Sequence, residues 1–296
     1  MATTNANGIQ IEYETFGDPS SPAVLLIIGL GSQLIHWQDE FCQRIADNGY
    51  HVIRYDNRDA GLSTKHDELT MPGIMEKIGA LFSGQKISTP YTIEDMANDA
   101  AGLLDALNID RAHICGMSMG GFIAQTFAIN NPSRTLSLTS IYSHCGNGKK
   151  FVPTQEAMAA MMTPAPAERE AFIEYALKFF KLISGTGLPF DEEFHRALVG
   201  RSYDRSFCPE GVVRQYLAIM VQKDRTAELS DLKVPSLIIH GDADPLVPMA
   251  GGKATAAAIP GASLKIISGM GHAIPNLNAY WGDIKDAMIN HMKKAE

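Results

Sequence analysis

Short and almost wholly apolar runs recur along the chain, and longer helical patterns separate them. Runs of this kind are typical of strands that are buried on both faces of a parallel sheet. They occur at 24–28, 51–55, 112–115, 135–142, 236–239 and 264–267. Because helical stretches join successive strands, we expect helices to cover both faces of the sheet. The sequence therefore predicts an α/β fold with a mostly parallel central sheet.

Two further segments give local predictions. The segment 9–14 alternates strictly between apolar and polar residues and predicts an antiparallel strand at the edge of the sheet. Thr92 offers a hydroxyl that can cap a helix, and Asp95 follows three residues later. Since apolar residues then recur at helical spacing from Ile93 to Leu107, we expect a helix that begins after Thr92.

One long stretch, from about 143 to 225, breaks the alternation, because it contains helical patterns and no convincing strand. Its candidate helices lie at 157–162, 168–183, 192–203 and 210–223. This stretch indicates an all-helical insertion inside an α/β chain. We expect a first part of the α/β core at 1–143, the helical insertion at 144–226 and a second part of the core at 227–296.

The sequence Gly-Met-Ser-Met-Gly at 116–120 follows a predicted strand and precedes a helical pattern at 122–129. A Gly-x-Ser-x-Gly sequence at a strand-to-helix turn is the pattern of a nucleophile elbow. The turn is so tight that a side chain at either glycine would collide with neighbouring backbone. It also puts Ser118 at a helix N-terminus, where backbone N–H groups favour a developing anion. The pattern therefore indicates that Ser118 is a nucleophile.

A nucleophilic serine needs a base, and the base needs a carboxylate that orients it. His272 follows the predicted strand 264–267, and two aspartates, Asp242 and Asp244, follow the strand 236–239. These side chains come after the ends of strands, at the edge where open α/β sheets bind their ligands. Spacing alone leaves both aspartates as candidates for the acid. The chain order of serine, aspartate and histidine is the order expected of α/β-hydrolases.

With these motifs, essentially the whole chain resembles the serine α/β-hydrolases of esterase type. The resemblance implies the α/β-hydrolase fold, with residues 144–226 as a helical cap. In the acid loop Asp-Ala-Asp-Pro-Leu-Val-Pro, it implies that the second aspartate, Asp244, is the triad member. The segments 29–37 and 55–63 are similar to the aclacinomycin methylesterase group, which are cap-bearing esterases that act on polyketide methyl esters.

The resemblance also implies an oxyanion hole with two backbone donors. One donor is the N–H of Met119, directly after the serine. The other comes from the loop after the strand 24–28, where family members often carry His-Gly and this chain has Ile28-Gly29. Since the donor is a backbone N–H, which by position belongs to Leu30, the missing histidine side chain need not remove it.

The same glycines and nearby charges allow other interpretations. Gly29-x-Gly31 after a strand suggests a dinucleotide site, but Leu34 stands where that fingerprint needs its third glycine. We therefore expect no nicotinamide or flavin cofactor. The charged residues at 56–59 could be catalytic, but ion pairs that order a loop explain them better. No His-x-x-x-His spacing occurs, so we expect no catalytic metal.

Soft apolar side chains are frequent in the helical insertion. Met158, Met162 and Phe180 could line a pocket for an acyl group or a ring system, since methionine adapts to irregular apolar ligands. The alternative is that they pack the insertion onto the core. Trp37 could gate the same pocket or pack its own loop. These four residues are the candidate substrate contacts.

Composition excludes several classes of function. The formal net charge of −8 disfavours nucleic acid as a partner. The chain contains no run of about 18 apolar residues, so we expect no membrane-spanning helix and no membrane partner. The N-terminal sequence lacks the basic start and apolar stretch of a secretory signal, and the four cysteines are widely spaced, so we expect a cytoplasmic protein.

Together these observations predict a carboxylic-ester hydrolase that works through an acyl-enzyme on small-molecule apolar esters, methyl esters among them. Two rival classes stay open. The same triad can serve thioester, lactone or carbon–carbon bond hydrolysis or perhydrolysis, because the fold hosts many chemistries. A binding protein could also use the pocket as a receptor with little turnover. The sequence indicates no oligomeric state.

Overall fold

The described part of the chain folds around a mixed sheet of eight strands. This architecture is seen in a computed structural model that describes residues 1–67, 69–146, 150–273 and 280–296. The strands are β1 (Ala2–Ala6), β2 (Ile9–Phe16), β3 (Ala23–Ile27), β4 (His51–Tyr55), β5 (Ala112–Met117), β6 (Thr135–Ile141), β7 (Ser236–Gly241) and β8 (Ser263–Ile267). Their order in the sheet is β1-β2-β4-β3-β5-β6-β7-β8. Six neighbouring strands run parallel, namely β4, β3, β5, β6, β7 and β8, so the predicted mostly parallel sheet is confirmed.

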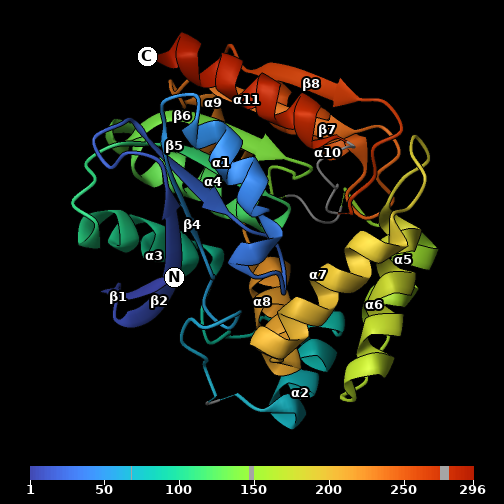
Figure 1. Cartoon of the computed structure of the whole chain (residues 1–296). Helices are drawn as coiled ribbons and strands as arrows, with labels where there is room; N and C mark the ends of the chain where they lie inside the picture. The colour runs from blue at the N-terminus through green and yellow to red at the C-terminus, as the bar shows by residue number, and fades with distance from the viewer. Residues whose placement is uncertain (68, 147–149, 274–279) are drawn as a thin grey trace.

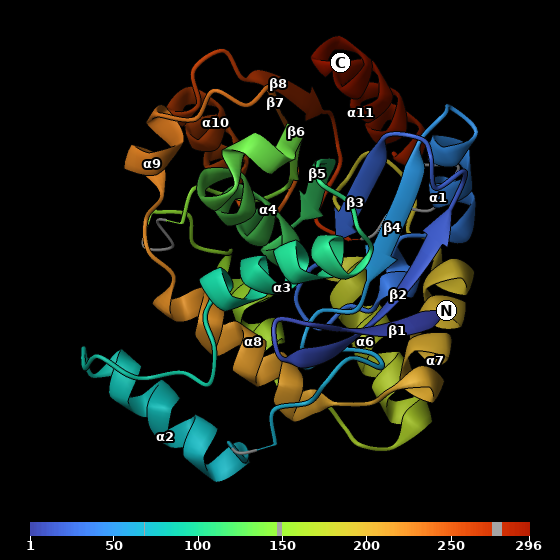
Figure 2. The same cartoon turned by 90° about the vertical axis from the view of Figure 1, so that its left-hand side faces the viewer.

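Helices cover both faces of the sheet, as the alternation of strands and helices predicts. Figure 2 shows α3 and α4 across one face, and α1 and α11 lie on the other side. The helices are α1 (Asp39–Ala46), α2 (Met71–Phe82), α3 (Ile93–Ala106), α4 (Met119–Asn130), α5 (Gln155–Met162), α6 (Arg169–Ile183), α7 (Glu192–Arg205), α8 (Pro209–Val221), α9 (Thr226–Ser230), α10 (Met249–Ala258) and α11 (Trp281–Ala295).

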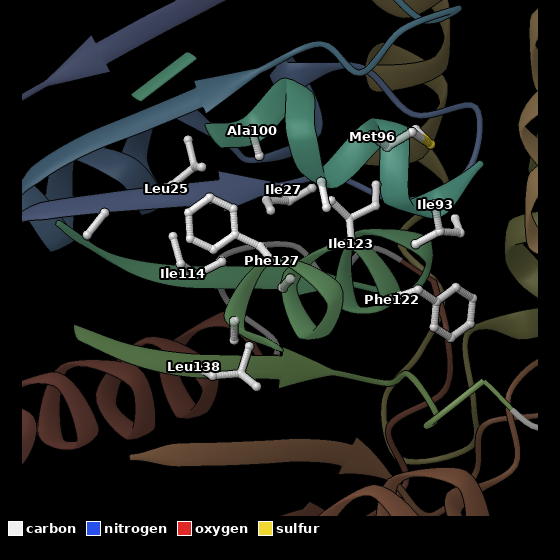
Figure 3. Packing of buried hydrophobic residues seen from close by; sticks show 14 of the residues in the cluster. Leu25, Ile27, Ile93, Met96, Ala100, Ile114, Phe122, Ile123, Phe127 and Leu138 are labelled. Carbon is white, nitrogen blue, oxygen red and sulfur yellow. The ribbon is translucent and has the colours of Figure 1, made fainter. Parts of the chain in front are cut away.

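Two apolar layers, one on each face of the sheet, form the largest part of the core. Along β3, Leu25 and Ile27 point into one layer, while Val24 and Leu26 point into the other. Figure 3 shows the first layer, in which side chains of α3 and α4 pack over those of β3, β5 and β6. Complete burial of a valine, leucine, isoleucine, phenylalanine or methionine side chain adds about 1.5–3 kcal/mol to the stability of the fold. Burial on both faces explains why these strands read as continuous apolar runs.

The two local predictions have different outcomes. The helix after Thr92 is confirmed, because the Thr92 hydroxyl accepts the N–H of Asp95 and the Asp95 carboxylate accepts the N–H of Thr92. The prediction that the strand at 9–14 lies at the edge of the sheet is wrong. The strand is antiparallel, but it is not the edge strand, because β1 pairs with its outer side. Asn7 and Gly8 join β1 to β2 with φ of 49° and 80°, which are the angles of a tight hairpin turn.

The helices α5 to α8 lie between β6 and β7 in the chain, within the segment where the sequence predicts helices alone. Figure 1 shows α5, α6 and α7 as a group beside the sheet, with α8 next to α2. Side chains cap three of these helices at their N-termini: Thr154 caps α5, Glu168 caps α6 and Asp191 caps α7. Each cap satisfies N–H groups that have no partner inside the helix, which fixes where each helix begins.

Candidate active site

Ser118 lies between the end of β5 and the first turn of α4. Its backbone has φ of 54° and ψ of −122°, a strained conformation for a residue with a side chain. Side chains at the two flanking glycines would be impossible, because a Cβ at Gly116 would overlap the carbonyl of Gly120, and one at Gly120 would overlap the carbonyl of Ile27. The tight turn leaves the Ser118 side chain half-buried at the carboxyl edge of the sheet.

Three side chains from separate parts of the chain meet at this edge. The Nε2 atom of His272 lies 2.8 Å from Oγ of Ser118, and its Nδ1 atom lies 2.7 Å from Oδ2 of Asp244. Since the carboxylate accepts the Nδ1 proton, Nε2 carries the free lone pair that can accept the serine proton. The ring of Tyr142 packs on the imidazole with centroids 4.6 Å apart. This arrangement can activate a serine hydroxyl.

Asp244 is buried, and hydrogen bonds surround its carboxylate. Oδ1 accepts the backbone N–H groups of Leu246 and Val247, both at 2.8 Å. The Nε2 atom of His240 lies 3.5 Å from Oδ2 and also contacts the carbonyl of Val247. Burial alone would raise the pKa of Asp244, but the neighbouring charge of His272 and the hydrogen bonds from both histidines lower the pKa to about 2. The carboxylate is therefore ionised at neutral pH.

Asp242, the other candidate for the acid, has different contacts. Its Oδ1 accepts the N–H of Gly269 at 2.6 Å, and its Oδ2 accepts the hydroxyl of Ser268 at 3.2 Å. Both donors lie in the loop that follows β8. The two aspartates thus contact the same loop at different places. Of these two, Asp244 is the one whose carboxylate lies within hydrogen-bond distance of the His272 ring.

The loop after β3 lies against the serine. A Cβ at Gly29 would be 3.2 Å from the Cβ of Ser118, so a side chain at this position would crowd the serine. Within it, the N–H of Ser32 donates to the carbonyl of Gly29, and the N–H of Gly31 donates to Oε1 of Gln215 at 2.8 Å. On the other side of the serine, Met119 is the first residue of α4, where backbone N–H groups have no partner within the helix.

Gln215 is a contact that sequence reasoning missed. It lies in α8 and is wholly buried, and its Nε2 atom donates to the carbonyl of Arg58 at 2.7 Å. One side chain thereby joins the loop after β3 to the loop after β4. Gln215 is 184 residues from Gly31, and a single glutamine in a helical pattern carries no local signal for such a contact.

The charged loop at 56–59 forms buried ion pairs, as predicted. Asp56 pairs with Arg205 at 2.7 Å, Arg58 with Asp99 at 2.6 Å, and Asp59 with Arg214 at 2.9 Å. Asp56 also accepts the N–H groups of Leu34 and Leu62. Its carboxylate is thus fully engaged within the protein, which leaves it unsuited to bind the ribose of a dinucleotide.

The candidate substrate contacts lie in different surroundings. Trp37 is wholly buried and its ring packs with those of Phe41 and Trp281, so its contacts are those of a residue that packs its loop. Phe180 is half-buried and packs with Ile183 and Ala273, which neighbours His272. Met158 is half-buried in α5, and Met162 at the end of the same helix is 43% exposed.

The described residues contain neither a metal-binding cluster nor a membrane-spanning helix. Among residues 1–67, 69–146, 150–273 and 280–296, no three histidine, cysteine or acidic side chains gather closely enough to hold a metal ion. In the same part of the chain, no helix is both long enough and apolar enough to cross a membrane.

Comparison with known proteins identifies the family. The family model described as "alpha/beta hydrolase fold" matches residues 22–278. Rhodomycin D methylesterase DauP of Streptomyces sp. (strain C5) is 31% identical over 88% of this chain and 88% of its own length. The 3-oxoadipate enol-lactonase 2 of Acinetobacter baylyi is 26% identical over 85% and 82% of the two chains. The crystal structure of the enol-lactonase from Burkholderia xenovorans LB400 superposes with a TM-score of 0.72 at 22% identity, over 99% of this chain and 100% of that one. The chain therefore belongs to the alpha/beta hydrolase fold family.

Proposed function

We propose that the protein is a carboxylic-ester hydrolase in which Ser118, His272 and Asp244 form the catalytic triad. The observation that carries the proposal is the continuous chain of short contacts from the serine to the aspartate, at 2.8 and 2.7 Å. Ser118 lies in a strained turn at a helix N-terminus. Strained backbone of this kind is often found at catalytic residues, which supports a role for Ser118 as the nucleophile.

In the proposed mechanism, Oγ of Ser118 attacks the ester carbonyl while Nε2 of His272 takes the hydroxyl proton. The ionised Asp244 accepts the Nδ1 proton in a hydrogen bond and stabilises the imidazolium. His272 then gives its proton to the leaving alcohol, and an acyl-enzyme remains on Ser118. Water, deprotonated by His272, attacks the acyl-enzyme and releases the acid.

The negative charge that develops on the carbonyl oxygen needs donors that are already in place. We assign this role to the backbone N–H groups of Met119 and Leu30. Met119 begins α4, and Leu30 lies in the loop that Gly29 brings against Ser118. Loss of one such donor typically lowers turnover on the order of 10²–10³-fold.

We further propose that residues 144–226 form a cap over the site, flanked by core segments at 1–143 and 227–296. Three contacts support this assignment. The N–H of Thr154 donates to the carbonyl of Pro245 in the aspartate loop, α5 and α6 share an apolar cluster with Ala273, and Gln215 of α8 holds Gly31. Phe180 and Met158 are the cap side chains that we assign to the acyl or ring-binding surface. Met162 and Trp37 are weaker candidates, because one is exposed and the other is packed in the core.

For the substrate, we propose small to medium apolar esters, and methyl esters in particular, because a relative 31% identical over most of the chain is named a methylesterase. A lactone is an internal ester and passes through the same acyl-enzyme, and another relative is named an enol-lactonase. Lactones therefore belong in the same assay as the second candidate class.

The test is hydrolysis of p-nitrophenyl esters from acetate to palmitate, of bulky aromatic methyl esters and of lactones, by the wild type and by Ser118→Ala. We expect the substitution to lower kcat on the order of 10⁴–10⁶-fold. Ser143→Ala is the matched control, because the Ser143 hydroxyl lies beside the elbow and donates to the Ser118 carbonyl, whereas the ring nitrogens of His272 bond to Asp244 and Ser118.

A fluorophosphonate probe gives an independent reading, since it adds to an activated serine. Mass spectrometry should find the adduct on the peptide that contains Ser118, and should find none in Ser118→Ala. Full activity in Ser118→Ala, or an adduct on another residue, would refute the triad. Tight ligand binding without turnover of any ester, lactone or thioester would instead favour a receptor.

A further inference from the structure

The loop after β8, residues 268–273, carries His272 and is held from two sides. From the core side, Asp242 accepts the N–H of Gly269, and the N–H of Ala243 donates to the carbonyl of Met270. These contacts fix the beginning of the loop. The backbone of His272 itself is held from the other side, by the end of α6.

The last carbonyls of α6 accept hydrogen bonds from this loop. The carbonyl of Ile183 accepts the N–H of His272 at 2.6 Å and that of Ala273 at 3.2 Å, and the carbonyl of Ser184 accepts the N–H of Gly271 at 3.1 Å. Terminal carbonyls of a helix have no partner within the helix and carry its negative partial charge. They are therefore strong acceptors, and here they point at the residue that precedes the histidine and at the histidine itself.

The segment after α6 returns hydrogen bonds to the same loop. The N–H groups of Thr186 and Gly187 both donate to the carbonyl of Gly269 at 2.9 Å, and Gly185 forms a single antiparallel bridge with Met270. In Figure 1 this yellow connection between α6 and α7 reaches the red segment that follows β8. Backbone atoms make the contact on both sides, so it depends on how closely these two segments of the chain approach each other.

Glycines make that approach possible. A Cβ at Gly185 would overlap the carbonyl of Gly269 and the N–H of Gly271, and a Cβ at Gly271 would overlap the carbonyl of Ile183. Gly185 also has φ of +90°, a conformation that side chains disfavour. A larger residue at 185 would therefore push the two backbones apart at the position of His272.

We infer that Gly185 and the carbonyl end of α6 are positioning elements for His272, so that the helical segment sets the geometry of the general base as well as covering the site. This inference rests on the proposed function, because it assigns a role to His272. Gly185 does not touch the reacting atoms and acts only through the backbone of the histidine loop.

The experiment compares Gly185→Ala with Gly49→Ala. The two glycines have nearly the same φ, +90° and +91°, so the strain of adding a methyl group is matched. A Cβ at Gly49 would meet no atom within 4 Å, so this variant carries the strain without the displacement. We expect Gly185→Ala to lower kcat by about 10²-fold with KM close to that of the wild type, as for a misplaced catalytic group. Gly49→Ala should keep both parameters.

Hydrogen exchange at the peptide that covers 268–273 provides a readout that does not depend on turnover. In the wild type, the amides of Gly271, His272 and Ala273 should exchange slowly; in Gly185→Ala they should exchange faster, and in Gly49→Ala they should not change. Fast exchange of these amides in the wild type would overturn the inference even if Gly185→Ala failed to fold. So would equal kcat values for the two variants.

The two proposals fail separately. If the wild type hydrolyses no ester, the proposed function is refuted, while the exchange data still test the backbone contact. If the wild type is an active, serine-dependent esterase and Gly185→Ala retains its kcat, the positioning role alone is refuted.

Discussion

Asp242 and Asp244 lie two residues apart in one loop and bind different groups. Asp242 binds the backbone of the histidine loop, whereas Asp244 binds the imidazole ring. Spacing could not separate them, because both follow the same strand at almost the same distance. The resemblance of the loop to a family pattern favoured Asp244, and the backbone N–H groups of Leu246 and Val247, which aim its carboxylate, give the physical reason.

At this scale we predict that Asp244→Asn lowers kcat by roughly 10³–10⁴-fold, because the amide favours the wrong tautomer of His272. Asp242→Asn is the control, since Asn keeps one acceptor oxygen for the Gly269 N–H. Steady-state kinetics on p-nitrophenyl esters distinguish the two. A larger loss in Asp242→Asn than in Asp244→Asn would assign the acid to Asp242.

The pH dependence of stability gives a second measure of the same variant. The pKa of Asp244 is lowered in the folded state to about 2, against 3.8 as its ordinary value, so the ionised form stabilises the fold by about 2 kcal/mol. This contribution is complete above pH 3.8 and is lost as the pH falls through 2. Urea unfolding should show a stability gap between wild type and Asp244→Asn at pH 7 that narrows below pH 3.8. A gap that is constant with pH would contradict the shifted pKa.

At the scale of helices and strands, sequence patterns predicted best where one local signal decides the outcome. The elbow follows from two glycines and a strand, and α3 begins where Thr92 and Asp95 cap each other. The hairpin β1–β2 was missed although Asn7-Gly8 is a strong turn signal, because the residues at 2–6 are mostly small and polar and do not resemble a strand. The contacts of Gln215 and Gly185 could not be predicted, since they join segments that only the fold brings together.

A buried ion pair fixes α8 against the loop after β4, and we predict a large cost for breaking it. Arg214 and Asp59 are both fully buried, with two guanidinium–carboxylate contacts of 2.9 Å. Arg214→Met would leave the Asp59 charge buried without its partner and should lower the free energy of unfolding by about 3–5 kcal/mol. The comparison is Arg196→Met, which removes exposed ion pairs with Glu174 and Glu192 and should cost no more than about 1 kcal/mol. Equal losses in urea unfolding would contradict the assigned burial.

At the scale of the whole molecule, the helices between β6 and β7 are tied to the core at several places around Ser118. Gln215 holds the loop after β3, Arg205 and Arg214 hold the loop after β4, and the end of α6 holds the loop after β8. Each tie involves buried or backbone polar groups that would lose their partners if the segment were absent.

We therefore predict that a chain in which a short Gly-Ser linker replaces residues 144–226 loses activity even towards p-nitrophenyl acetate, whose acyl group is too small to need a pocket. Near-UV circular dichroism and urea unfolding should show a weakened or non-cooperative core, because Asp56 and Asp59 would be left without their arginines. A shortened chain that folds cooperatively and hydrolyses the acetate would show that the core is complete without the helices.

The close backbone contact between Gly185 and the histidine loop has a consequence for how such enzymes change over evolutionary time. Recombination that exchanges the helical segment for that of a distant relative must also inherit a matching loop after β8, or the glycines will no longer face one another. If α5 and α6 line the substrate surface as proposed, we expect new substrate ranges to arise more easily from point substitutions on the faces of these helices that do not touch this contact. On this view we expect the segment to adapt in place rather than to be exchanged as a module.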